Sequence, residues 1–210
     1  MKKSLLLLAL ACSSFAASAA ESNGIGYSYA ELDYIYNDSS VGDFKGPGLQ
    51  GSIELGKGFF ATGSYNRQKI NHFGGSNSVT EWSLGGGFAK ALSPNLDWVS
   101  QAAFVEQDAD VSLRQFGIPG AANSTSEDVS GFRVSSGVRG RLTAKLLGHA
   151  YLGYQDLGDI RNDLGDFKFG GDVYGDLGLE YQFTDTWSAT TNVKLSQGVS
   201  EYAAGLRLSF

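Results

Sequence analysis

The chain has 210 residues, including 29 glycines and a single cysteine, and its formal net charge is −6. This length fits one domain. The acidic balance, without any basic patch, argues against a nucleic-acid-binding protein. The single cysteine excludes a disulfide framework and a cysteine-based metal site.

Residues 1–20 have the pattern of a secretory signal peptide. Two lysines precede an apolar run from Leu5 to Ala11, and small residues follow. The apolar run is too short for a membrane-spanning helix. Two overlapping Ala-x-Ala-like sites predict cleavage after Ala19 or Ala20.

Cys12 leaves a second interpretation open, a lipoprotein signal in which the acylated cysteine becomes the new N-terminus. The segment Ala9-Leu10-Ala11-Cys12 is a poor lipobox, because the position three before the cysteine is usually Leu. We therefore expect an ordinary signal peptide. Its removal leaves one domain, residues 21–210, with no cysteine and a net charge of −8.

Period-two alternation of apolar and polar residues recurs along this domain, and helical periodicity is almost absent. Ten runs carry the alternation, at 24–36, 47–57, 59–70, 79–91, 96–107, 130–143, 148–157, 171–183, 187–197 and 199–210. The first run changes parity, which a β-bulge near Ala30 would explain. The fifth run is irregular, because Val99 and Val105 fall on its polar face.

The connections between the runs alternate in length. "GKG", "LSPN", "TAKL" and "TDT" are short, and much longer polar stretches lie between them. Only the last connection, "SQG", breaks this rule. Short turns at one end and long loops at the other are typical of an up-and-down antiparallel sheet.

Aromatic residues on the apolar faces fall at two levels. The level near the short turns holds Tyr27, Phe59, Phe88, Trp98, Tyr181, Phe183, Trp187 and Phe210, and the level towards the long loops holds Tyr65, Trp82, Phe104, Phe132, Tyr154 and Tyr202. Two aromatic belts around an apolar band favour a transmembrane barrel over a soluble β-sandwich. Lipid offers no hydrogen bonds, so such a sheet must close on itself. The sequence predicts an all-β, closed antiparallel up-and-down barrel of about ten strands, with eight as the alternative.

Charged residues share the polar parity of the runs and should point into the barrel lumen. They are Arg133, Arg139, Arg141, Lys194, Arg207, Glu54, Glu81, Asp176, Glu180 and Glu201. In a narrow barrel these charges would pair and fill the lumen, since buried charges persist only when paired. In a wider barrel they would line a pore.

The chain ends on Gly205-Leu206-Arg207-Leu208-Ser209-Phe210, which follows the pattern Gly-x-x-apolar-x-apolar. This strand resembles the last strand of the small outer-membrane β-barrel proteins of Gram-negative bacteria, of the OmpA/OmpX-like type, although Ala203 replaces their preferred polar residue. The resemblance implies that Gly205, Leu208 and Phe210 form a signal read by the barrel-assembly machinery. It also implies an outer-membrane location, among phospholipid and lipopolysaccharide.

No motif indicates a cofactor, a metal site or a catalytic residue. "GSIELGKG" nearly spells a phosphate-binding loop, but Gly58 replaces the Mg²⁺-binding Ser or Thr and no helix pattern follows. The acidic stretch from Asp156 to Asp172 lacks the EF-hand spacing, so weak Ca²⁺ or Mg²⁺ binding is only an alternative.

We expect a non-enzymatic outer-membrane barrel with a structural, surface-interaction or adhesion role, whose loops can meet a host or surface ligand. Two alternatives stay open. One is a narrow pore for small ions. The other is an enzyme acting on lipid or peptide at the rim, with His72 beside a carboxylate or serine; His149 is expected at the opposite, short-turn end.

Overall fold

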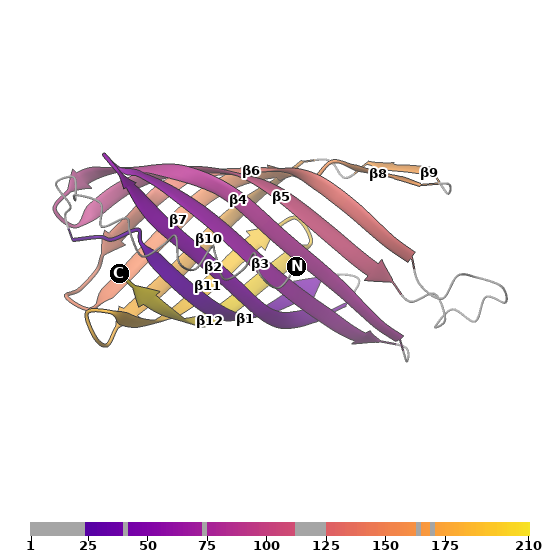
Figure 1. Ribbon diagram of the computed structural model, residues 1–210, viewed down its shortest axis with the longest axis horizontal. Helices are drawn as coiled ribbons and strands as arrows, with labels where there is room; N and C mark the ends of the chain where they lie inside the picture. The colour runs from indigo at the N-terminus through magenta and orange to yellow at the C-terminus, as the bar shows by residue number, and fades with distance from the viewer. Residues whose placement is uncertain (1–23, 40–41, 73–74, 112–124, 163–164, 169–170) are drawn as a thin grey trace, which may run out of the picture.

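Ten antiparallel strands form a closed barrel in the computed structural model, which describes residues 24–39, 42–72, 75–111, 125–162, 165–168 and 171–210 (Figure 1). Neighbouring barrel strands follow one another in the chain, and the first strand pairs with the last to close the ring. The predicted fold is therefore confirmed, with ten strands and not eight. In the described part of the chain, no helix is long and apolar enough to cross a membrane.

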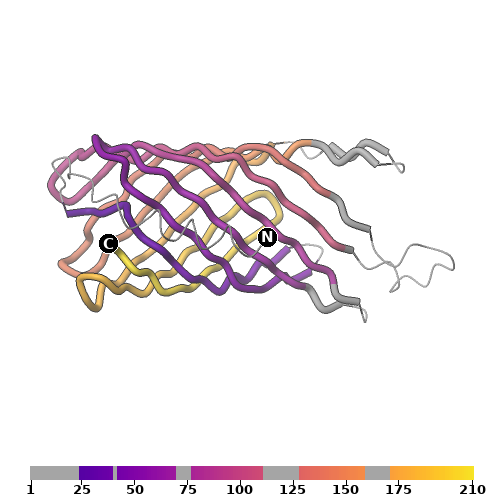
Figure 2. Tube along the Cα trace, in the orientation of Figure 1, coloured from indigo at the N-terminus to yellow at the C-terminus, as the bar shows by residue number. Residues whose placement is uncertain are grey.

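The barrel strands overlap the ten predicted runs one by one. They are β1 (Tyr29–Ser39), β2 (Phe44–Gly56), β3 (Phe59–His72), β4 (Gly75–Ser93), β5 (Leu96–Val111), β6 (Thr125–Arg141), β7 (Leu146–Asp156), β10 (Asp172–Gln182), β11 (Trp187–Ser196) and β12 (Val199–Ser209). A separate hairpin of β8 (Asp159–Asn162) and β9 (Gly165–Lys168) follows β7. Figure 2 traces the strands at a common tilt to the long axis, with the C-terminus at the short-turn end.

The alternation of the sequence decides which face each side chain takes. On β10, Leu177 and Leu179 are exposed on the outer surface, while Tyr174 and Glu180 are buried in the lumen. The outer surface carries large exposed apolar side chains on every barrel strand from β1 to β12. An apolar exterior of this extent is far larger than the patches found on soluble monomers.

The start of the barrel differs from the prediction. The pairing of β1 with β2 and β12 runs without a shift from Tyr29 onwards, so no bulge lies near Ala30. The parity changes because residues 24–28 precede the strand. Ile25 and Tyr27 from this segment are buried inside the barrel. The prediction that Tyr27 belongs to the aromatic belt near the short turns is therefore wrong.

An apolar cluster fills the lumen at its short-turn end. It consists of Ile25, Tyr27, Phe60, Val99 and Leu147, and the rings of Tyr27 and Phe60 stack with centroids 5.0 Å apart. The three strand residues lie near the starts of β3, β5 and β7, just after the short connections. This packing explains why Val99 is apolar on a face that is otherwise polar.

The sheet is much taller on one side of the barrel. β4, β5 and β6 have 19, 16 and 17 residues, whereas β11 has 10. In Figure 1 these strands, together with β3, which pairs with β4 up to their hairpin, project beyond the strands on the other side of the barrel at the long-loop end. Beyond Phe104 the polarity of β5 reverses: its outward face continues with Glu106 and Asp108, and its inward face holds the fully buried Val105.

Candidate functional site

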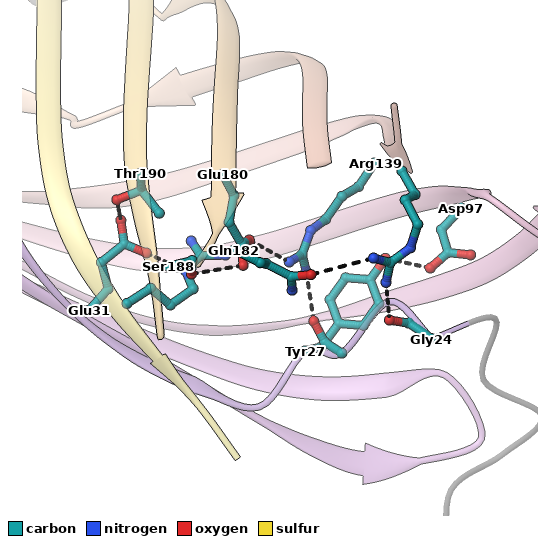
Figure 3. A network of polar contacts seen from close by, with 12 residues as sticks. Gly24, Tyr27, Glu31, Asp97, Arg139, Glu180, Gln182, Ser188 and Thr190 are labelled. Atoms are coloured by element: carbon teal, nitrogen blue, oxygen red, sulfur yellow. Dashed lines mark hydrogen bonds and ion pairs between the residues drawn. The ribbon is translucent and has the colours of Figure 1, made fainter. Parts of the chain in front are cut away.

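A chain of buried ion pairs crosses the lumen from β6 to β1. Arg139 Nη2 lies 3.0 Å from Glu180 Oε2, and Arg207 Nη1 lies 2.8 Å from the same oxygen (Figure 3). Arg207 Nε donates to Glu31, whose other oxygen accepts a 2.6 Å bond from Thr190 Oγ1. Both carboxylates are thus fully engaged, as buried charges must be.

Glu31 is a lumen charge that the sequence prediction missed. It lies on the face of β1 opposite Leu32 and Tyr34, which are both exposed on the outer surface. The apolar residues at 32, 34 and 36 contained this signal. The conflicting parity of Ile25 and Tyr27 obscured it.

Residues 24–28, which we call the plug segment, are held by three other strands. Arg139 Nη1 donates to the carbonyl of Gly26 at 2.9 Å. The amide of Tyr27 donates to Glu54 Oε1 on β2 at 2.7 Å, and its hydroxyl donates to Asp97 Oδ2 on β5 at 2.8 Å. Figure 3 shows Tyr27 and Gly24 beneath Arg139 and beside Asp97.

The plug segment is bonded to the wall opposite the strand into which it leads. It leads directly into β1, yet its backbone is held by Arg139 and Arg141 of β6. In the closed order of strands, β6 is five steps from β1 in either direction, which is the opposite wall. The segment and the apolar cluster around it therefore close the short-turn end of the lumen.

A second polar network lies nearer the long loops. Arg133 forms a 3.3 Å ion pair with Glu81, and its Nε donates to Gln155. Lys194 also donates to Gln155 Oε1, at 3.1 Å, and its ammonium lies 4.7 Å from the ring centre of Tyr174. A cation over an aromatic face is stabilised by the ring's negative charge density.

The remaining predicted lumen charges lie on the inner face as well. Asp176 Oδ1 lies 3.0 Å from His149 Nε2, and His149 stacks on Tyr151. Arg141 donates to the carbonyl of Gly24 at 2.8 Å. Glu201 stands opposite Lys194 in the pairing of β11 with β12.

The other predicted belt residues lie on the outer face. In the belt near the short turns, Phe59 and Phe88 pack with ring centroids 4.9 Å apart. In the belt near the long loops, Trp82 packs on Phe104 in the same way, with centroids 5.6 Å apart. The others on this face are Trp98, Tyr181, Phe183, Trp187, Tyr65, Phe132, Tyr154 and Tyr202.

The residues of the C-terminal motif have separate structural environments. Phe210 is 65% exposed, and its amide donates to the carbonyl of Ser28 at 3.2 Å. Leu208 lies opposite Trp187 in the pairing of β12 with β11. Gly205 faces the lumen, where a Cβ would approach Asp33 Oδ1 to 2.1 Å. The packing favours glycine there, because a Cβ would also come within 2.8 Å of the backbone carbonyl of Leu32.

The described residues give little support for a catalytic or metal-binding site. The phosphate-loop-like stretch lies in β2 and a tight turn, in which Gly56, Lys57 and Gly58 all have positive φ. The side chain of His72 lies outside the described residues, as do those of the acidic stretch from 159 to 168. Among the side chains that are described, no group of three or more His, Cys, Asp or Glu could hold a metal ion.

The fold and lumen define a closed β-barrel protein with an apolar exterior and a charged interior. The chain matches no protein-family model and no curated protein. Three solved structures that are similar to it are bacterial barrels. The β domain of the Bordetella autotransporter BrkA is 14% identical over 88% of this chain and 99% of its own, with a TM-score of 0.53.

The transport unit of the Escherichia coli autotransporter AIDA-I is 13% identical over 100% of this chain and 98% of its own, with a TM-score of 0.52. Neisserial surface protein A is 17% identical over 88% and 96%, with a TM-score of 0.46. The likeness to the two autotransporter domains is one of fold.

Proposed function

We propose that this protein is a non-enzymatic outer-membrane barrel. The barrel lies in the membrane, and its long-loop end faces the outside of the bacterial cell. The signal peptide, the C-terminal motif and the OmpA/OmpX-like resemblance support this location. The exterior supports it too, because Leu84 and Leu152 are largely exposed between two aromatic belts. Lipid is the surrounding that removes this apolar area from water.

The observation that carries the proposal is the closed short-turn end. Arg139 and Arg141 of β6 hold the plug segment against the wall opposite β1. Above the segment, the lumen charges are tied to one another across the barrel. A general diffusion pore needs an open lumen, and about eight to ten strands leave little more room than side chains fill.

The tall side of the barrel, formed by β4, β5 and β6, supports a role in binding at the cell surface. Past Phe104 the outward face of β5 turns acidic, with Asp108 opposite Asp128 of β6. Acidic side chains on both strands fit a sheet that has left the lipid and stands in water. This extension and the long loops are the part offered to a surface ligand or to neighbouring envelope components.

A narrow pore is the second candidate, and the cavities favour it. Two adjoining cavities of about 240 and 180 Å³ lie in the lumen above the apolar cluster. The enzyme alternative depends on His72, whose side chain lies outside the described residues.

Single-channel recording of the refolded protein in a planar bilayer tests the proposal. The full mature chain should show no large, steady conductance. Deletion of residues 21–28 should produce ion-conducting events, because it removes the plug segment. Deletion of the β8–β9 hairpin, which lies outside the barrel wall, is the matched control and should stay silent. Large, steady conductance of the intact protein would favour the pore.

Location is tested separately by fractionating cells that express the chain. The protein should be recovered with the outer membrane, require detergent for extraction and shift in gel mobility on heating. Recovery as a soluble periplasmic protein would contradict a membrane anchor.

A further inference from the structure

The lumen contains a cavity of about 240 Å³ above the apolar cluster. It continues into the second cavity of about 180 Å³, because both are lined by Gln50, Ser64 and Tyr174. The second cavity reaches Glu201, near the end where the long loops leave the barrel. The two cavities together form a pocket that is closed below and leads towards the long loops.

The cavity exists because one wall of the lumen has small side chains. Ser52, Ser64, Ser83 and Ala103 face inward from the consecutive strands β2, β3, β4 and β5. The long side chains of the opposite wall cannot fill the space, since Arg207 and its partners are tied into ion pairs. Small residues facing tethered ones leave room for a solute.

The small wall offers hydrogen-bonding groups without charge. Ser64 and Ser83 line the cavity and hydrogen-bond to each other at 2.7 Å, and Ser52 lines it as well, with its Oγ enclosed by protein. Gln50, Gln101 and Thr62 add neutral donors and acceptors on the same wall. Tyr29 and Tyr151 supply rings on the other side.

We infer that this pocket binds a small neutral polyhydroxyl solute, of the size of glycerol to a monosaccharide. The larger cavity, of about 240 Å³, exceeds a single-water site and is below the volume of pockets for drug-sized ligands. Hydroxyl groups match the neutral wall, and the ring faces of a sugar match the tyrosines. A charged solute fits poorly, because Glu31, Glu180 and Arg133 are already paired.

Saturation-transfer NMR on the refolded mature protein in detergent micelles tests this site. The neutral probes are glycerol, glucose and N-acetylglucosamine, and glucuronate is the charged probe of similar size. At least one neutral probe should receive saturation from the protein and be displaced by another neutral probe. Glucuronate should bind at least tenfold more weakly, since its carboxylate would be buried without a partner.

Two adjacent alanines of β5 provide a matched pair of variants. Ala103→Leu fills the cavity and should abolish the signal, whereas Ala102→Leu points outward from the same strand and should leave it unchanged. Gln101→Met removes a neutral amide from the cavity wall and should weaken binding about two- to tenfold, the equivalent of one neutral hydrogen bond. Heat-modifiable gel mobility checks that each variant is folded.

The inference is overturned if no neutral probe receives saturation, if glucuronate binds as well as glucose, or if Ala103→Leu binds like Ala102→Leu. If Ala103→Leu does not fold, Gln101→Met decides the matter, because the two side chains are close in volume and the exchange adds no bulk to the wall. Unchanged affinity in Gln101→Met then overturns the site. None of these readouts depends on whether the barrel conducts ions.

Discussion

Arg139 donates a hydrogen bond to the backbone carbonyl of Gly26, a residue 113 positions earlier in the chain, in the segment that leads into β1 on the opposite wall of the barrel. The same guanidinium is paired with Glu180 and lies 4.9 Å from the ring centre of Tyr27. One side chain thus joins the plug segment to the ion-pair chain of the lumen. The stability of the wall and the closure of its short-turn end are therefore coupled.

Arg139→Ala should destabilise the barrel and open a leak. It removes charge-assisted bonds to Glu180 and Gly26, and each such bond contributes roughly 1.5–3 kcal/mol. Glu180 keeps Arg207 and Ser188, so the barrel should still fold. Urea titration in lipid vesicles measures the loss, and bilayer recording measures the leak. Arg67→Ala, at an exposed position of β3, is the control. Equal urea midpoints for the two variants would refute the role of Arg139.

If the outer face meets lipid, as we propose, neighbouring positions of β6 should give opposite results. Val134 is exposed on the outer surface, and Val134→Arg should cost roughly 2–4 kcal/mol in folding into vesicles. We expect the same at Val138, Leu177, Leu179 and Val193. Ser135 lines the lumen cavity, so Ser135→Arg should cost much less. Equal tolerance at 134 and 135 would contradict the register.

Substitutions at Phe59 and Phe60, two neighbours on β3, compare the outer surface with the apolar cluster of the lumen. Phe60 is 5% exposed and stacks on Tyr27, whereas Phe59 is 54% exposed on the outer surface. Phe60→Ala should lower the free energy of unfolding by roughly 3–5 kcal/mol, because it leaves a cavity. Phe59→Ala should cost less, since lipid can fill the space. Denaturant titration of the two variants in the same vesicles gives the comparison. A larger loss for Phe59→Ala than for Phe60→Ala would mean that β3 turns its other face to the lumen.

Deletion of Phe210 should separate an assembly signal from a structural role. The side chain of Phe210 is largely exposed, so the shortened chain should refold in detergent with nearly unchanged heat-modifiable mobility. If the C-terminal motif is read by the barrel-assembly machinery, the same deletion should strongly reduce the folded protein in cells. Gly205→Ala should instead impair refolding in vitro as well, because its Cβ would clash with Asp33. Normal assembly of the Phe210 deletion in cells would count against the signal.

The strand number, the turns and the faces of most residues could be predicted, because each depends on local alternation. The ends of the tall strands could not. Past Phe104 the apolar residues change face, so a run defined by one parity ends at 107 while β5 continues to Val111. Alternation detects a strand only while its surroundings stay the same.

The plug segment shows a second limit. Ile25 and Tyr27 alternate like strand residues, but they are apolar because they pack on Phe60 and Val99, which are distant in the chain. Parity also predicted that Arg139 and Glu180 point inward, without indicating which acid each base would meet. Partners across a lumen depend on the closed order of strands, and no local pattern contains that order.

The pairing of Tyr29 with Ser209 has a consequence for how the chain is made. This seam joins the earliest strand to the latest, so during synthesis it is the last contact to become available. Any shortened product that stops within β11 leaves two unpaired strand edges, which lipid cannot satisfy and which readily join other chains. Closure of the seam therefore depends on the full set of strands. Only a chain translated through β12 can complete the barrel without exposed strand edges.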